Sequence, residues 1–122
     1  MIKALGLIMG SLFLLGGILG LVPGVTKDGL YFGIFMVNTP HNVLHIASGT
    51  IFLIASFLGP RAARWWFKSF GIFYAALAAI GFWVGDGMIL HLIMNNQYDS
   101  WGHAALALIM LLIGFAAPTA KQ

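Results

Sequence analysis

Two histidines stand four residues apart in the stretch NTPHNVLHIASG, which leads into an apolar run. At this spacing His41 and His45 share one face of a helix. The stretch NNQYDSWGHAAL repeats the spacing, so Asp99 and His103 share a face in the same way. Three imidazoles and one carboxylate together suit zinc or another borderline divalent metal ion. These four residues are therefore candidate ligands of a metal ion.

Further residues bear on the same site. His91 is a candidate additional ligand, and nearby amides are candidates to orient the imidazoles by hydrogen bonding. These amides belong to Asn38, Asn42 and Asn96. Haem b is the competing cofactor, because His45 and His103 on two helices could ligate its iron from opposite faces.

The same residues also admit a structural interpretation. Asn38 is a good N-cap residue, and Asn96 with Asp99 resembles a capping box. His45 and His103 could hydrogen-bond to each other or to a loop carbonyl, as polar residues between membrane helices commonly do. A bound cofactor and a hydrogen-bonded cluster are therefore both open interpretations.

The composition predicts where these residues must lie. Of the 122 residues 61% are hydrophobic and 7% are charged, whereas soluble domains carry about 25% charged residues. The absence of cysteine excludes disulfides, thiolate metal sites and covalently attached haem. Four long apolar runs occupy Ala4–Val22, Val43–Leu58, Ser69–Val84 and Trp101–Ala117. We predict an all-α, four-helix transmembrane bundle that forms a single integral membrane domain over residues 1–122.

The few cations predict the orientation of the chain. Most of them lie near the termini or in a predicted loop over Gly59–Lys68, whereas Lys27 lies on the other side. The cations on the first side are Lys3, Arg61, Arg64, Lys68 and Lys121. By the positive-inside rule both termini are cytoplasmic, and the polar cluster lies near the outer membrane surface.

The two halves of the chain resemble each other. When residues 28–57 are aligned with residues 86–115, nine of the thirty positions are identical. They are Asp28/Asp86, Gly29/Gly87, Met36/Met94, Asn38/Asn96, His45/His103, Ala47/Ala105, Ile51/Ile109, Leu53/Leu111 and Phe57/Phe115. We predict an internally duplicated helix pair, with repeats over 1–60 and 61–122 that are parallel in the membrane. Each repeat has an Asp-Gly turn and a short interfacial or re-entrant segment between its two helices.

The two polar stretches resemble the paired signatures of a bacterial family catalogued as domain of unknown function 4383. The first signature maps onto Phe35, Val37, Asn38, His41, Asn42 and His45, and the second maps onto Asn96, Asp99 and His103. Gly102 and Ala107 depart from the family pattern, in which a leucine and a glycine are more common. The resemblance implies a four-helix protein of the bacterial cytoplasmic membrane, and it supplies no activity.

Three functional hypotheses follow. The first is a small membrane protein with a His/Asp polar cluster that binds a metal ion. The second is an accessory or structural subunit that packs against a larger membrane complex or a second copy of the chain. The third is a redox protein with a bis-histidine haem. We expect the partner to be the lipid bilayer and no nucleic acid, since the cations are thinly spread. The sequence contains no arrangement of nucleophile and base that indicates an enzyme.

Overall fold

Most of the protein is helical. The computed structural model describes residues 1–22, 24–27, 30–31, 33 and 35–118. The helices are α1 (Ile2–Gly20), α2 (Thr39–Leu58), α3 (Pro60–Val84) and α4 (Gln97–Ala116). Each helix is long and apolar enough to cross a membrane, which confirms the predicted set of four. Because α2 begins at Thr39, four residues before the apolar run, His41 and His45 lie in its first two turns.

Gly59 joins α2 to α3 without a loop. Its φ of 134° is open to glycine and unfavourable for residues with a Cβ atom. Its N–H donates to the carbonyls of Ala55 and Ser56 at 3.2 and 3.3 Å. Pro60 then opens α3, where its fixed φ suits the first turn. The predicted loop over Gly59–Lys68 is therefore wrong, because a single glycine reverses the chain.

The connections within each helix pair contain short antiparallel strands, which the all-α prediction did not include. One sheet has the order β1-β2-β3, and the second has the order β4-β5. The strands are β1 (Thr26–Lys27), β2 (Leu30–Tyr31), β3 (Phe35–Met36), β4 (Gly87–Ile89) and β5 (Ile93–Asn95). Met88 pairs with Met94, and Leu30 pairs with Met36. The predicted turn at Asp28 and Gly29 and the cation Lys121 lie outside the described residues.

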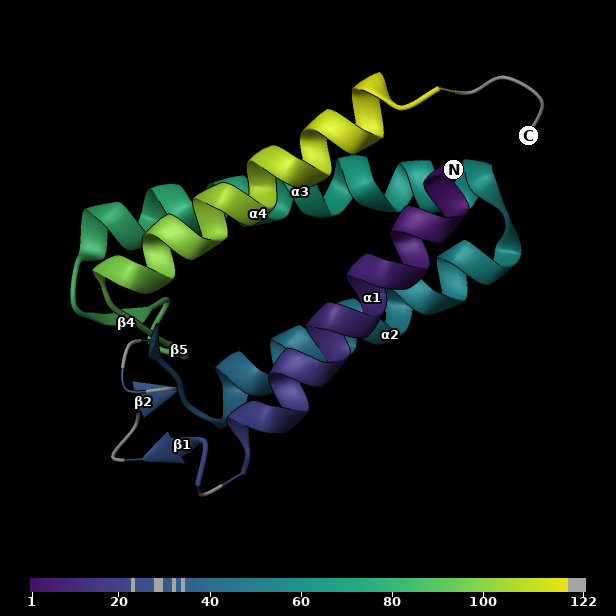
Figure 1. Ribbon diagram of the computed structural model, residues 1–122. Helices are drawn as coiled ribbons and strands as arrows, with labels where there is room; N and C mark the ends of the chain where they lie inside the picture. The colour runs from purple at the N-terminus through teal and green to yellow at the C-terminus, as the bar shows by residue number, and fades with distance from the viewer. Residues whose placement is uncertain (23, 28–29, 32, 34, 119–122) are drawn as a thin grey trace.

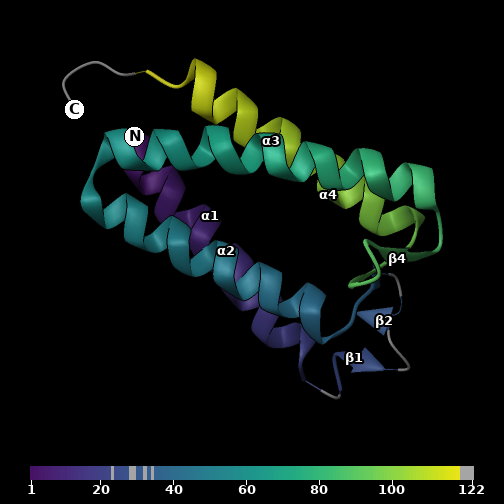
Figure 2. The ribbon, with the colours of Figure 1, turned by 180° about the vertical axis from the view of Figure 1, so that it is seen from behind.

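The helices form two closely packed pairs, α1 with α2 and α3 with α4. The pairs contact each other mainly through α2–α3 and α1–α3. Figures 1 and 2 show that the pairs meet near the α2–α3 junction and diverge toward the other end, where the strands lie. The beginning of α1 and the end of α4 both lie toward the junction end (Figure 1). Helices α2 and α4 therefore run in the same direction, and both begin beside the strands.

Glycines permit the close approach within each pair. A Cβ atom added to Gly49 would lie 2.5 Å from the Leu14 nitrogen and 2.6 Å from the Gly10 carbonyl oxygen. A Cβ atom on Gly114 would lie 3.0 Å from the Lys68 nitrogen. Since these neighbours are backbone atoms that cannot rotate away, only glycine fits, as is typical of packing between membrane helices.

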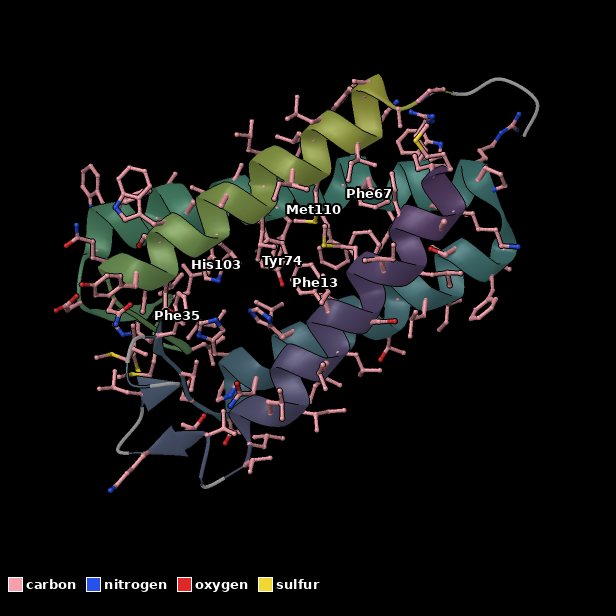
Figure 3. All side chains as sticks on the ribbon, in the orientation of Figure 1. Phe13, Phe35, Phe67, Tyr74, His103 and Met110 are labelled. Carbon is pink, nitrogen blue, oxygen red and sulfur yellow. The ribbon has the colours of Figure 1, made fainter. Side chains whose placement is uncertain are left out.

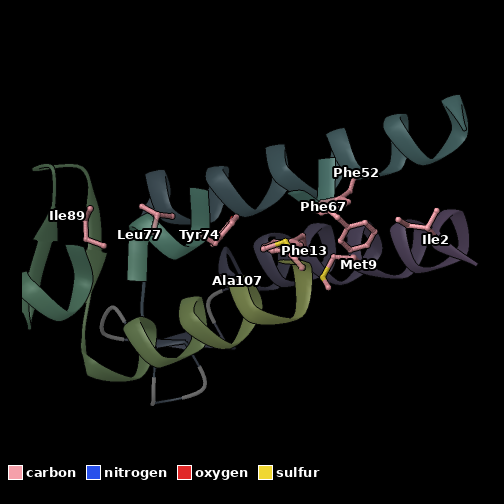
Figure 4. Close-up of a cluster of buried hydrophobic side chains, with 10 residues drawn as sticks. Ile2, Met9, Phe13, Phe52, Phe67, Tyr74, Leu77, Ile89 and Ala107 are labelled. Atoms are coloured by element: carbon pink, nitrogen blue, oxygen red, sulfur yellow. The ribbon is translucent and has the colours of Figure 1, made fainter. Parts of the chain in front are cut away.

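Aromatic side chains fill the space between the two pairs. Phe52 and Phe67 contact each other edge to face with ring centroids 4.9 Å apart, and Phe13 contacts Tyr74 at 5.3 Å. The buried cluster extends from Ile2 near the junction end to Ile89 in β4 (Figure 4). This core holds the two pairs together, and its residues Phe13 and Tyr74 contact the polar residues at the diverging end.

Arg64 connects the two helices of the second pair. Its guanidinium donates to the carbonyls of Gly114 and Ala117, both at 2.8 Å, and to that of Pro118 at 3.2 Å. The side chain therefore satisfies carbonyls left open at the end of α4, where a positive charge is also favoured by the helix dipole.

Candidate metal centre

Asn38 fixes the beginning of α2 against the second hairpin. Its Oδ1 accepts the N–H of His41 at 3.1 Å, which caps the helix, and the N–H of Met94 at 3.3 Å. Its Nδ2 donates to the Leu92 carbonyl at 2.8 Å. The predicted amide therefore orients the site through the backbone rather than through an imidazole ring.

Asp99 has the corresponding role at the beginning of α4. The Asn96 side chain accepts the N–H of Asp99 at 2.9 Å, and Asp99 Oδ2 accepts the N–H of Asn96 at 3.0 Å, which completes the predicted capping box. The same Oδ2 accepts the N–H of Met36 in β3 at 3.0 Å. Asp99 thus ties the second helix pair to the first.

Three of the four predicted ligands converge. His41 and His45 lie one turn apart on α2, and His103 reaches them from α4. Their ligand atoms all lie within 4.8 Å of one another. The ring centroids are 5.2 Å apart for His41–His45, 5.4 Å for His41–His103 and 6.3 Å for His45–His103. His41 and His103 are buried, and His45 is half-buried. Figure 3 shows His103 directed into the space between the pairs.

The hydrogen bonds of the rings bear on their use as ligands. His41 Nδ1 lies 3.0 Å from the Met94 carbonyl oxygen, which can only accept. In the neutral ring Nδ1 therefore carries the proton and Nε2 carries the lone pair that a metal ion requires. His103 Nδ1 is buried and has no hydrogen-bond partner among the described residues.

Two aromatic side chains that the sequence reasoning missed form the inner wall of the site. The Tyr74 ring centroid lies 5.5 Å from that of His103 and 6.2 Å from that of His45, and Phe13 lies 5.3 Å from His45. Ser48 Oγ donates to the Leu44 carbonyl at 2.7 Å and therefore accepts from the Tyr74 hydroxyl at 3.0 Å. Tyr74 thus presents its ring, and not its proton, to the imidazoles. The sequence feature that could have indicated Tyr74 is its hydroxyl, which stands within an otherwise apolar run.

A cavity of about 220 Å³ adjoins the imidazoles. Its polar lining residues are His41, Asn42, His45, Asp99 and His103. Apolar residues complete the wall, including Gly16 of α1, Phe35 of β3 and Leu106 of α4. The cavity thus lies where the two helix pairs diverge, and it borders both α1 and α4.

The remaining predicted residues have different positions. Asn42 is buried and lines the cavity. Asp99 also lines the cavity, but it is not in the group of three close ligands. His91 is exposed in the turn between β4 and β5, and it is neither in that group nor in the cavity wall.

The fold and the site together define a protein with four helices able to cross a membrane and a three-histidine cluster at one end of the bundle. The chain belongs to the family described as domain of unknown function DUF4383, whose model matches residues 3–116. This membership confirms the family resemblance of the two polar signatures. No curated protein and no solved structure matches the chain.

Proposed function

We propose that this protein is an integral membrane protein that binds one divalent transition-metal ion, best zinc, through His41, His45 and His103. The convergence of three imidazole ligand atoms within 4.8 Å of one another carries the proposal. Neutral imidazole is the commonest protein ligand of such ions. Three imidazoles would leave one position of a tetrahedral zinc ion open.

The spacing of the imidazoles suits an ion after small side-chain rotations. Zinc–nitrogen bonds of about 2.0–2.1 Å in tetrahedral geometry separate two ligand nitrogens by about 3.3 Å. The ligand atoms therefore need to approach each other by no more than about 1.5 Å. The adjoining cavity provides space for this movement.

Two hydrogen-bonding features support an ion rather than a purely structural cluster. The bond from His41 Nδ1 to the Met94 carbonyl favours the tautomer in which the lone pair for a metal ion is on Nε2. The unpartnered Nδ1 of His103 costs about 1–3 kcal/mol as a buried polar atom, and a metal bond there would remove that cost.

A haem b is a poorer occupant of the same space. Axial ligation by His45 and His103 would require the macrocycle to lie between their rings, where His41 contacts both. The cavity of about 220 Å³ is also smaller than the roughly 300–1,000 Å³ typical of pockets for drug-sized ligands. A small cation therefore fits the described residues better.

We further propose that the chain is a duplicated helix pair with both termini on the cytoplasmic side. Reciprocal contacts support the duplication. His41 bonds to the backbone of Met94, and Asp99, 58 positions after His41, bonds to the backbone of Met36, 58 positions before Met94. Lys3 and Arg61 at the junction end of the bundle support the orientation by the positive-inside rule. Outward-facing apolar side chains, such as Phe57 and Phe115, suit contact with lipid.

Metal analysis of the protein in lipid nanodiscs tests the proposed ion. We expect about one zinc per chain in the wild type, and a loss of zinc affinity of about 100-fold or more in His103→Ala, because one of three ligands is removed. The absorption spectrum of the same sample tests for haem. His103→Ala breaks no described hydrogen bond of the ring, so the helical content should persist.

His91 provides a matched control within the chain. Replacing it by asparagine, which tolerates the left-handed backbone at φ 59°, removes an imidazole outside the cluster. We expect His91→Asn to bind zinc as the wild type does. Equal zinc binding by wild type and His103→Ala, or no zinc binding by either, would contradict the proposal.

A further inference from the structure

We infer that the metal ion carries an exchangeable small anion in its fourth position, on the side facing the cavity. This inference rests on the proposed metal site. Three neutral imidazoles would leave the ion with its full double positive charge. Such a charge within an apolar bundle is strongly unfavourable without a counter-ion. An anion bound directly to the ion reduces the charge at the shortest distance.

Asp99 is not placed to supply that charge as a direct ligand. It is the one carboxylate in the described cavity wall, but its Oδ2 already accepts two backbone N–H groups at 3.0 Å. Its oxygens also lie outside the group of ligand atoms within 4.8 Å of one another. Movement toward the ion would leave the N–H groups of Met36 and Asn96 without their acceptor. The fourth ligand is therefore expected to come from outside the chain.

The volume of the cavity indicates how large an anion it can accommodate. About 220 Å³ of space for water-sized groups is well above the roughly 10–15 Å³ that one water molecule needs, so the cavity has room for several small groups. This volume suits a monoanion of a few heavy atoms, such as azide or formate, together with water. The apolar wall at Phe35 and Leu106 lowers the local dielectric, which strengthens the attraction between ion and anion.

Gly16 offers a way to fill the cavity without altering the imidazoles. It lines the cavity from α1, and a Cβ atom added there meets no atom within 4 Å. A leucine at this position would occupy space that the anion needs. Gly16→Ala also replaces the glycine, but it adds only one methyl group. It is therefore the matched control for Gly16→Leu.

Cobalt(II) in place of zinc makes the fourth ligand visible, because its d–d absorption depends on the ligands it binds. We expect the wild type in nanodiscs to bind one Co²⁺ and to change its spectrum saturably when azide is added. Gly16→Leu should retain the Co²⁺ and weaken azide binding by about tenfold or more. Gly16→Ala should weaken azide binding much less than Gly16→Leu does, and Asp99→Asn should retain the anion-free Co²⁺ spectrum.

The outcomes separate this inference from the proposed function. A protein that binds Co²⁺ through the histidines but shows no spectral change with azide overturns the inference alone. An anion-free Co²⁺ spectrum that changes in Asp99→Asn identifies Asp99 as the fourth ligand and overturns it as well. Equal azide affinity in Gly16→Leu and Gly16→Ala places the anion outside the cavity, against the inference. A wild type that binds no Co²⁺ overturns both proposals.

Discussion

Removal of the Asp99 carboxylate should destabilise the fold and leave the metal site able to bind. In Asp99→Ala two backbone N–H groups, those of Asn96 and Met36, lose an acceptor at 3.0 Å. Asp99 is 4% exposed, so bulk water has little access to replace the carboxylate. A hydrogen bond contributes about 0.5–1.5 kcal/mol net between neutral groups and about 1.5–3 kcal/mol when one group is charged. We therefore expect the free energy of unfolding to fall by about 2–4 kcal/mol.

Denaturant unfolding in mixed micelles, followed by circular dichroism, measures this change. Asp99→Asn keeps one carbonyl oxygen as an acceptor, so its free energy of unfolding should fall by about half as much as that of Asp99→Ala. Asp86→Ala removes an exposed carboxylate beside β4 and serves as the control, with a change within about 0.5 kcal/mol. If Asp99→Ala unfolds like the wild type but releases its zinc, Asp99 acts as a ligand, and our assignment of the carboxylate to backbone contacts is refuted.

Two further predictions concern packing and backbone strain. Gly49→Ala should destabilise the α1–α2 pair by about 1–3 kcal/mol, because the new methyl group meets backbone atoms of Leu14 and Gly10, whereas Gly16→Ala should be nearly neutral in the same unfolding assay. The turn at Leu90 and His91 has φ values of 52° and 59°, which disfavour residues with a Cβ atom by about 1–2 kcal/mol each. Replacing the pair by Asn-Gly should therefore raise the free energy of unfolding by about 1–2 kcal/mol, and an unchanged value would show that this turn is unstrained.

Much of the fold was predictable because a membrane simplifies the sequence pattern. Long apolar runs with few charges indicate spanning helices directly, and all four were found. The caps at Asn38 and Asn96 were also predictable, since each is a local interaction between residues three positions apart. The short strands and the glycine reversal at Gly59 were not predicted. Apolar segments of a few residues have no distinctive period, and a single glycine gives little warning of a sharp turn.

In the candidate site, too, the local contacts were predictable from the sequence and the long-range contacts were not. Spacing by four residues places His41 beside His45, and Asp99 beside His103, whatever the rest of the fold does. Only the packing of two helix pairs decided that His103 meets the first two histidines and that Tyr74 supplies the wall. Only the packing of α4 against β3 decided that Asp99 accepts the N–H of Met36 and does not lie in the group of three close ligands. Helical periodicity determines which residues share a face, whereas contacts between elements depend on how the faces pack, and that is a property of the whole chain.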